Sequence, residues 1–348
     1  MNAGISVYIG LEDYPLGETI KYLKYASSLG IEHVFSSAHI NEATNSFDEL
    51  QSMIDECSKL GLKLTLDISK PMYEKLGTLK RVYSFRLDYG FSNEEIVNLS
   101  NSGIHKIELN ASTISKAKLQ TLIDLGLNLS ETTMSFNFYP KLYTGHSIDD
   151  VYEKTQTFRE LGMTVAAFIP SKINFRPPMY EGLPTVEAHR HIDTALAIEE
   201  LKACGIDTIY FGDAYATEEE LKLLVHHNTS ELMLKFNPKC KLTKLDPALF
   251  ALSHKIRPDY NDLMLRLSAT RNKEVITVFN VEERNYLDVT IDNQLFKRYA
   301  GEINIILKPL PKDNRVNVIG NIDATDVILA AIKKGKSFKF EIIEKEVK

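Results

Sequence analysis

Five short apolar runs in the first two-thirds of the chain each end in polar residues of the kind that carry out chemistry. These end residues are Asp67, then Arg86 with Asp88, then Glu108 with Asn110, then Asn137, and finally Asp213. One such residue alone would be an ordinary loop start or helix N-cap. Five in series at strand–helix spacing instead favour a (β/α)8 barrel, which builds its active site from polar groups at one end of successive strands.

The spacing of apolar residues from about residue 4 to residue 230 predicts eight alternating strands and helices. The predicted strands are 4–9, 33–36, 62–67, 82–87, 104–109, 128–137, 164–168 and 208–211. Helical patterns lie between them, including one over 187–203, and several end in a glycine just before the next strand, where a left-handed C-cap is expected. No GxGxxG follows the first strand, which weakens a dinucleotide-binding alternative.

The pattern changes after residue 235 to short β-branched runs separated by turns. We expect strands at 275–279, 287–291, 303–307, 316–319 and 338–343. The sequence therefore predicts two domains, a barrel over 1–235 and a small β-rich barrel over 236–348.

The bulk composition excludes several classes of partner. The 348 residues carry a net charge of −6 without a Lys/Arg block, so we expect neither nucleic-acid nor membrane-surface binding. The N-terminus lacks a signal-peptide pattern, no apolar stretch approaches the length of a membrane span, and Cys57, Cys204 and Cys240 show no metal-type spacing. A cytoplasmic protein is the expectation.

Two carboxylates are candidates for acid–base chemistry. Side chains alternate along a strand, so Arg86 shares a face with Asp88, and Glu108 shares one with Asn110. On neighbouring strands, Asp88 and Glu108 would lie roughly 5–10 Å apart, a separation at which two carboxyl groups can divide the work of glycoside hydrolysis. Arg86 could keep Asp88 ionised, and it could equally form only a local ion pair. Asp67 is a second candidate base, or an N-cap.

Cations and helix starts near strands seven and eight predict an anion site, since barrels frequently bind phosphate there. Lys172 and Arg176 lie in a long proline-rich loop, and Arg190 lies early in the next predicted helix, with Thr185 as its expected N-cap. Asp213 is assigned a role in substrate contact. His39 could join the carboxylates in a metal site, but no HxH or HExxH motif supports one, so we expect no metal.

Several longer motifs resemble the signatures of the MupG family of 6-phospho-N-acetylmuramidases. In the barrel they are Ile107-Glu-Leu-Asn-Ala-Ser112, Phe136-Asn-Phe-Tyr-Pro140 with Tyr143-Thr-Gly145, and Glu181-Gly-Leu-Pro-Thr-Val-Glu-Ala-His-Arg190. In the second domain they are Thr290-Ile-Asp-Asn293, Arg298-Tyr-Ala-Gly-Glu302 and Arg315-Val-Asn-Val-Ile-Gly320. Two departures concern strand six, where Lys141-Leu142 replaces a basic–proline pair and His146 replaces an apolar residue.

The resemblance implies a TIM barrel followed by a cyclophilin-like β domain, and a hydrolase without a cofactor. Its implied substrate is 6-phospho-N-acetylmuramic acid β-1,4-linked to N-acetylglucosamine, taken up during peptidoglycan recycling. The residues in matching motifs are Glu108, Asn110, Asn137, Tyr139, Glu181, His189 and Arg190. Arg86, Lys172, Arg176 and Arg190 are the cations available for the phosphate and the lactyl carboxylate.

We therefore predict a metal-independent glycosidase with Glu108 as general acid and Asp88 or Asp67 as the second carboxylate. Another phosphosugar barrel enzyme, an isomerase or aldolase, is the first alternative, and a non-catalytic sugar-phosphate sensor is the second. The β domain could cover the barrel mouth within one chain or across a homodimer.

Overall fold

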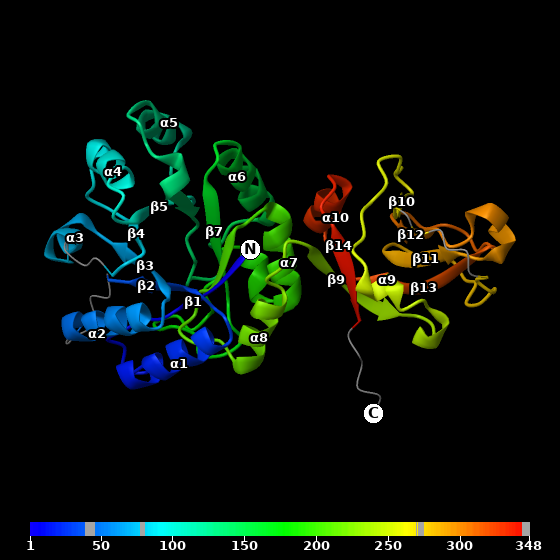
Figure 1. Ribbon diagram of the computed structural model, residues 1–348, viewed down its shortest axis with the longest axis horizontal. Helices are drawn as coiled ribbons and strands as arrows, with labels where there is room; N and C mark the ends of the chain where they lie inside the picture. The colour runs from blue at the N-terminus through cyan, green and yellow to red at the C-terminus, as the bar shows by residue number, and fades with distance from the viewer. Residues whose placement is uncertain (39–45, 77–80, 269, 271–274, 343–348) are drawn as a thin grey trace. The chain divides into compact units, whose positions relative to one another are not determined.

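The protein folds into two compact units in the computed structural model, which describes residues 1–38, 46–76, 81–268, 270 and 275–342 (Figure 1). The first unit runs from Met1 to Asn228 and the second from Thr229 to Lys348. Together they confirm the expected fold class of a (β/α)8 barrel followed by a β-rich part.

Eight parallel strands of the first unit close into a barrel in sequence order, β1 to β8, with β1 paired to β8 (Figure 1). The strands are β1 (Asn2–Ser6), β2 (His33–Ser37), β3 (Lys63–Ile68), β4 (Ser84–Leu87), β5 (Lys106–Asn110), β6 (Thr132–Ser135), β7 (Thr164–Ile169) and β8 (Thr208–Phe211). Because all eight are parallel, their carboxyl ends meet on one face, where (β/α)8 enzymes carry their active sites.

Helices connect the strands and lie outside them (Figure 1). They are α1 (Leu16–Ser28), α2 (Ser46–Lys59), α3 (Lys70–Leu76), α4 (Asn93–Ser100), α5 (Lys116–Asp124), α6 (Ile148–Glu160), α7 (Thr194–Cys204) and α8 (Glu218–His226), with 3-10 turns η1 (Leu129–Glu131) and η2 (Glu187–Arg190). Capping boxes start α4 at Ser92 and α8 at Thr217, where a hydroxyl and a glutamate satisfy backbone N–H groups.

An aromatic layer fills the barrel interior. Phe35, Phe168 and Tyr210 are buried against one another, and the partly buried Phe138 packs on them. Space for this layer depends on Gly4, because a Cβ there would lie 2.4 Å from the Tyr210 ring.

One helix of the barrel begins later than the sequence predicts. The pattern from Glu187 predicts a helix capped by Thr185, but η2 ends at Arg190 and α7 begins at Thr194, with Asp193 as its N-cap. Thr185 is buried and bonds to the backbone of Phe168 and Asn137 instead. The predicted helix start at Thr185 is therefore wrong. The Thr185 side chain bonds to the backbone of two other segments and does not cap a helix.

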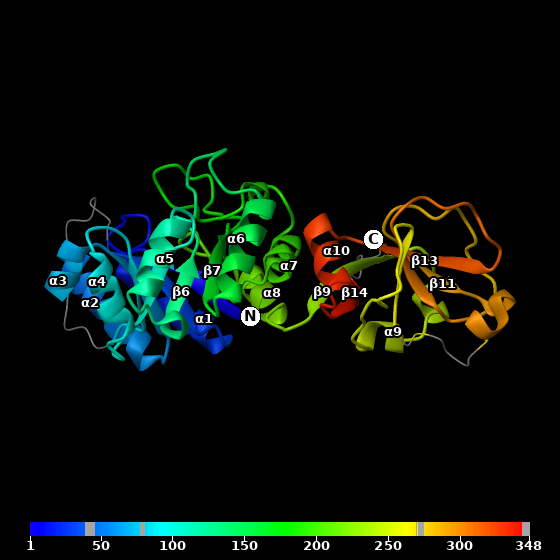
Figure 2. The same cartoon turned by 90° about the horizontal axis from the view of Figure 1, so that it is seen from above.

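The second unit is a curled six-stranded sheet with the order β10-β12-β11-β13-β9-β14. Its strands are β9 (Leu232–Pro238), β10 (Met264–Arg266), β11 (Asp288–Asp292), β12 (Ile303–Ile306), β13 (Val316–Ile322) and β14 (Phe338–Ile342). Its helical elements are η3 (Leu242–Lys244), α9 (Ala248–Ala251), η4 (Gln294–Tyr299) and α10 (Asp326–Lys333). Pairing is antiparallel except between β14 and β9, and α10 lies beside these two strands in both views (Figure 2).

One predicted strand of this unit is wrong. Residues 275–279 form no strand, although their β-branched composition favours one. Their backbone groups bond to side chains and to a turn instead of to a ladder: Asn317 binds both Thr277 and Phe279, and Ile276 accepts from the Gln294 N–H.

Among the described helices, none has the length and apolar character needed to cross a bilayer.

Candidate active site at the barrel mouth

Three charged residues lie at the same level of three neighbouring strands. In β3, β4 and β5, Asp67 pairs in register with Arg86, and Arg86 pairs with Glu108. Since side chains alternate along a strand, residues in register share a face of the sheet. The closed barrel thus brings together, in one row, three of the residues predicted from the sequence.

Glu108 is the most unusual member of this row because it is a nearly buried carboxyl group with one free oxygen. Its Oε1 accepts a hydrogen bond of 2.8 Å from the Thr65 hydroxyl, whereas no described residue donates to Oε2. Burial raises the pKa of Glu108, and the Thr65 hydroxyl, the nearby Arg86 and the Ser135 hydroxyl oppose this rise only in part. Such a group holds its proton to higher pH than an exposed glutamate.

Arg86 connects the row to the next strand of the barrel. Its side chain is 7% exposed; Nη1 donates to Asp67 Oδ1 at 2.8 Å and Nη2 donates to Asn137 Oδ1 at 2.5 Å. Asn110 donates to the same Asn137 oxygen at 3.0 Å. Arg86 Nε, like Glu108 Oε2, is buried without a hydrogen-bond partner among the described residues. Buried polar atoms are almost always paired, so two without a described partner at the strand ends make Glu108 and Arg86 candidates for a functional role.

A second group of polar side chains contacts the backbone of Asn137. The sequence did not predict that these side chains form a group. The Ser112 hydroxyl accepts from the Asn137 N–H at 2.9 Å, and its Oγ lies 2.9 Å from His146 Nε2. That nitrogen also lies 2.9 Å from the Tyr139 hydroxyl, while Nδ1 of His146 lies 2.5 Å from Asp150. Burial lowers the pKa of His146. Ser112 and Tyr139 lie in the family-like motifs and His146 departs from the family pattern, so the sequence carried a signal for each of these three members.

Asp88 lies one residue beyond the end of β4 and is exposed. Its backbone N–H donates to the Ile68 carbonyl. Asp67 is the carboxylate that the structure places beside Arg86, with the Ser37 hydroxyl at 3.4 Å from its other oxygen.

On the opposite side of the mouth, Asp213 follows β8 and is fully buried. Its Oδ2 accepts backbone N–H groups of Ser171 and Leu183 at 3.0 and 3.1 Å, and Oδ1 accepts that of Arg176 at 3.3 Å. Burial raises the pKa of Asp213 to about 6 against these hydrogen bonds. In this arrangement Asp213 anchors the loop from residue 170 to residue 184. Gly212 permits the close approach, because a Cβ there would lie 2.3 Å from the Leu183 carbonyl oxygen.

Arg190 is a second anchor, with a side chain only 2% exposed. Its guanidinium donates to the backbone oxygens of Glu181 and Gly182 at 2.8 Å, to those of Tyr139 and Lys141, and to the Glu187 carboxylate. Burial acts to raise the pKa of Glu187, but Arg190 and two backbone N–H groups bring it down to about 2. Arg190 therefore ties the loop after β7 to the segment after β6.

The remaining residues predicted near strands seven and eight lie in two places. His189 is buried with Nε2 at 2.9 Å from Glu200. Glu181 is exposed, and with Lys172, His189 and Arg190 it lines a cavity of about 430 Å³. Arg176 lies elsewhere: its guanidinium carbon is 4.7 Å from the Tyr8 ring centroid and 5.3 Å from that of Phe138. Arg176 is thus a partly exposed cation that packs on aromatic side chains at the mouth.

No group of three or more His, Cys, Asp or Glu side chains suited to a metal ion occurs in the described part of the chain. His39, the histidine considered for such a site, lies outside the described residues.

Two family models match almost the whole chain. The N-terminal domain of 6-phospho-N-acetylmuramidases matches residues 3–226, and the C-terminal domain of the same family matches residues 232–341. No curated protein matches the chain.

Two solved structures are similar over the full length. An uncharacterised protein from B. cereus has 28% sequence identity and a TM-score of 0.86, covering 98% of this chain and 99% of its own. A conserved protein of unknown function from Enterococcus faecalis has 30% identity and a TM-score of 0.68, with coverage of 98% and 96%.

Proposed function

Because both domain models match it, the chain belongs to the 6-phospho-N-acetylmuramidase family of glycosidases, and we propose that it hydrolyses a phosphorylated cell-wall disaccharide. The substrate is 6-phospho-N-acetylmuramic acid β-1,4-linked to N-acetylglucosamine, and the reaction serves peptidoglycan recycling in the cytoplasm. The observation that carries the proposal is the buried Glu108, whose Oε2 has no hydrogen-bond partner among the described residues, in one row with the Arg86–Asp67 pair.

Glu108 is the general acid in this proposal. Thr65 donates to Oε1, so the proton of the neutral acid sits on Oε2, the oxygen without a protein partner. A raised pKa keeps that proton in place until a glycosidic oxygen accepts it. The proton then moves from Oε2 to the leaving oxygen as the bond to the anomeric carbon breaks.

Asp67 is the second carboxylate. It lies in register with Arg86, one strand further from Glu108, and its ion pair with Arg86 is largely shielded from solvent. It either activates water or attacks the anomeric carbon, according to whether the enzyme inverts or retains configuration. Asp88, which is exposed, is the alternative for this role.

Arg176 binds an anionic group of the substrate. Its guanidinium is held over two rings at the mouth, and its planar fork suits two oxygens of a phosphate or a carboxylate. Asn110, two residues after Glu108 in β5, and Asn137, bonded to Arg86, offer the amide groups that sugar hydroxyls need. Lys172 lines the 430 Å³ cavity and is the alternative phosphate ligand.

The test is incubation of the full chain with the disaccharide in its 6-phosphorylated and unphosphorylated forms, followed by mass spectrometry. We expect cleavage of the phosphorylated form at a much higher rate. Equal cleavage of both would refute the anion site, and cleavage of neither would refute the substrate. NMR of the first-formed anomer then distinguishes inversion from retention.

A matched pair of variants tests the second carboxylate. Asp67→Asn should abolish most turnover, whereas Asp88→Asn should leave it close to the wild-type value. The reverse result would transfer the role to Asp88.

A further inference from the structure

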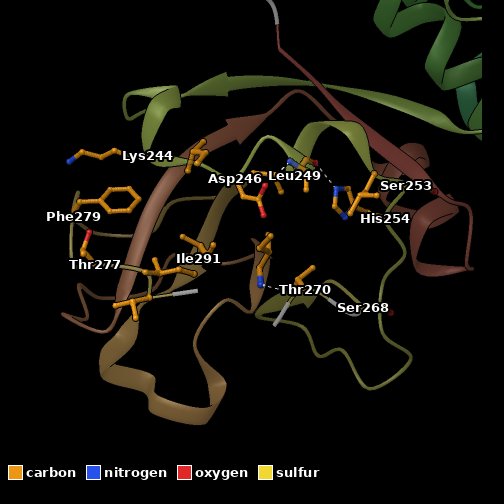
Figure 3. Close-up of a pocket in the computed structure, with 16 residues that line it drawn as sticks. Lys244, Asp246, Leu249, Ser253, His254, Ser268, Thr270, Thr277, Phe279 and Ile291 are labelled. Atoms are coloured by element: carbon orange, nitrogen blue, oxygen red, sulfur yellow. Dashed lines mark hydrogen bonds between the residues drawn. The ribbon is translucent and has the colours of Figure 1, made fainter. Parts of the chain in front are cut away.

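The second unit contains a cavity of about 520 Å³ that the barrel chemistry does not use (Figure 3). This volume lies in the range of small-molecule sites, about 300–1,000 Å³. All of the described residues around it belong to the second unit, from Lys244 to Ile303. Most of the wall is apolar, formed by Leu245, Leu249, Leu252, Val275, Ile276, Phe279, Ile291 and Ile303.

One wall is the segment 275–279, which is held in place although it forms no strand. Asn317 is fully buried; its Nδ2 donates to the Thr277 carbonyl at 2.9 Å and its Oδ1 accepts from the Phe279 N–H at 3.1 Å. Asn293 donates to the same Asn317 oxygen at 3.0 Å. Two asparagines from family-like motifs of the second domain therefore fix this wall, so the cavity does not depend on a ligand to form.

The facing wall is helix α9 with the chain that follows it. His254 is buried, and its Nε2 lies 2.7 Å from the Leu249 carbonyl, to which it donates. Burial lowers the pKa of His254, which favours the neutral ring. His254 also exchanges backbone hydrogen bonds with Phe338 of β14, which anchors this wall to the sheet.

Among the described residues that line the cavity, Lys244 is the one lysine or arginine and Asp246 the one carboxylate. Figure 3 shows Lys244 beside Phe279 at one end of the cavity, with His254 and Ser253 at the other. The Nζ of Lys244 lies 5.0 Å from the Phe279 ring centroid, and within the described residues it makes no ion pair. Asp246 also lies at the rim, where its Oδ1 accepts from the Ala248 N–H at the start of α9.

We propose that this cavity binds a small organic anion with an aromatic or branched apolar body. The body would fill the space between Leu249, Ile276 and Ile291, and the anionic group would contact the Lys244 ammonium. The apolar walls favour a ligand with an apolar body over a sugar phosphate, because burying hydroxyl groups costs free energy unless each finds a partner. The site therefore differs in chemistry from the barrel mouth, and the proposal does not depend on the proposed substrate.

The experiment uses two fluorescent probes that differ in charge. The anionic probe is 8-anilinonaphthalene-1-sulfonate and the uncharged one is N-phenyl-1-naphthylamine, each titrated into the full chain. We expect saturable binding of one anionic probe per chain. Lys244→Gln should weaken it about tenfold, equivalent to about 1.4 kcal/mol, and leave the uncharged probe unchanged. Lys241→Gln is the matched control, since this exposed lysine of the same segment does not line the cavity.

A cavity-filling variant supplies the second readout. Ile291→Phe should weaken both probes, and thermal unfolding will show whether the variant stays folded. The proposal is wrong if the anionic probe binds wild type and Lys244→Gln equally, or if a folded Ile291→Phe chain keeps full affinity for both probes. Because Lys244→Gln replaces an exposed side chain, it remains decisive even if Ile291→Phe does not fold.

Discussion

The two sides of the barrel mouth use charged residues in opposite ways. On the side of β3 to β6, Asp67, Arg86 and Glu108 interact with other side chains and leave two buried polar atoms open. On the side of β7 and β8, Asp213 and Arg190 direct most of their hydrogen bonds to loop backbone. Asp213 follows a barrel strand closely, just as Asp67, Arg86 and Glu108 lie at strand ends, so position alone does not separate the two kinds of residue.

The two sides differ in how many hydrogen-bonding positions of each charged group remain available to a ligand. A carboxylate that accepts three backbone N–H groups is committed to one loop conformation and has little capacity for a ligand. A carboxyl group with an unpartnered oxygen can bond to substrate without first breaking a protein contact. The first side is therefore expected to carry chemistry, and the second to carry the shape of the mouth.

Glu108→Gln should produce the largest effect on activity and should leave stability unchanged. Removing a general acid costs about 10²- to 10⁴-fold, so we expect a loss of about 10³-fold in kcat, about 4 kcal/mol. The melting temperature should not fall, because burial raises the pKa of Glu108 and so favours the neutral form that the amide reproduces. Turnover assays and thermal unfolding check both points. A folded variant with full activity would remove Glu108 from the chemistry.

Arg190→Ala should have the opposite kind of effect, because it should lower the free energy of unfolding. Truncating a buried, paired charge costs about 3–5 kcal/mol, because Glu187 and several carbonyls lose their partner. Arg81→Ala is the control, since its pair with Asp55 is exposed and contributes little. Denaturant unfolding measures both. If Arg190→Ala kept wild-type stability and lost only turnover, Arg190 would belong with the catalytic side.

Asp213 predicts a pH dependence of stability. Its pKa is raised to about 6 in the folded chain, so between about pH 4 and pH 6 the folded protein holds a proton that the unfolded chain has released. The free energy of unfolding therefore falls as pH rises through this window, by up to about 3 kcal/mol, and levels off above it. Asp292, with a pKa raised to about 7 in the second unit, acts in the same direction.

The Asp213 contribution is isolated by comparing wild type with Asp213→Asn. The variant should be less stable throughout, because it cannot accept all three N–H groups, and its slope over this pH window should be smaller. An unchanged slope would show that Asp213 does not titrate in this range.

Arg176→Gln should give the smallest effect. It tests whether one residue on the β7–β8 side binds substrate while Asp213 and Arg190 hold the loop. We expect KM for the phosphorylated disaccharide to rise about tenfold, about 1.4 kcal/mol, with a smaller change in kcat. Steady-state kinetics with Lys172→Gln as the matched variant measure it. A larger effect from Lys172→Gln would locate the anion in the 430 Å³ cavity instead.

Local patterns in the sequence were enough for the barrel and for a set of candidate residues at its strand ends. Strand–helix periodicity and terminal glycines predicted eight βα units, and alternation along β5 predicted that Glu108 and Asn110 share a face. Both inferences depend on residues close together in the chain, where backbone geometry alone determines the outcome.

Only the tertiary structure decided which charges are free. Arg86 meets Asn137 across 51 residues, and Asp213 meets the Ser171 N–H across 42. Closure of the barrel brings these residues together. It leaves Glu108 and Arg86 each with a polar atom that has no described partner, whereas Asp213 is bonded to the backbone of a loop. Residues 275–279 give a second example. Their β-branched composition predicts a strand, but Asn317 bonds to the backbone groups of Thr277 and Phe279 instead of a neighbouring strand. Whether a polar group is open depends on its neighbours in space, and a pattern read along the chain does not contain them.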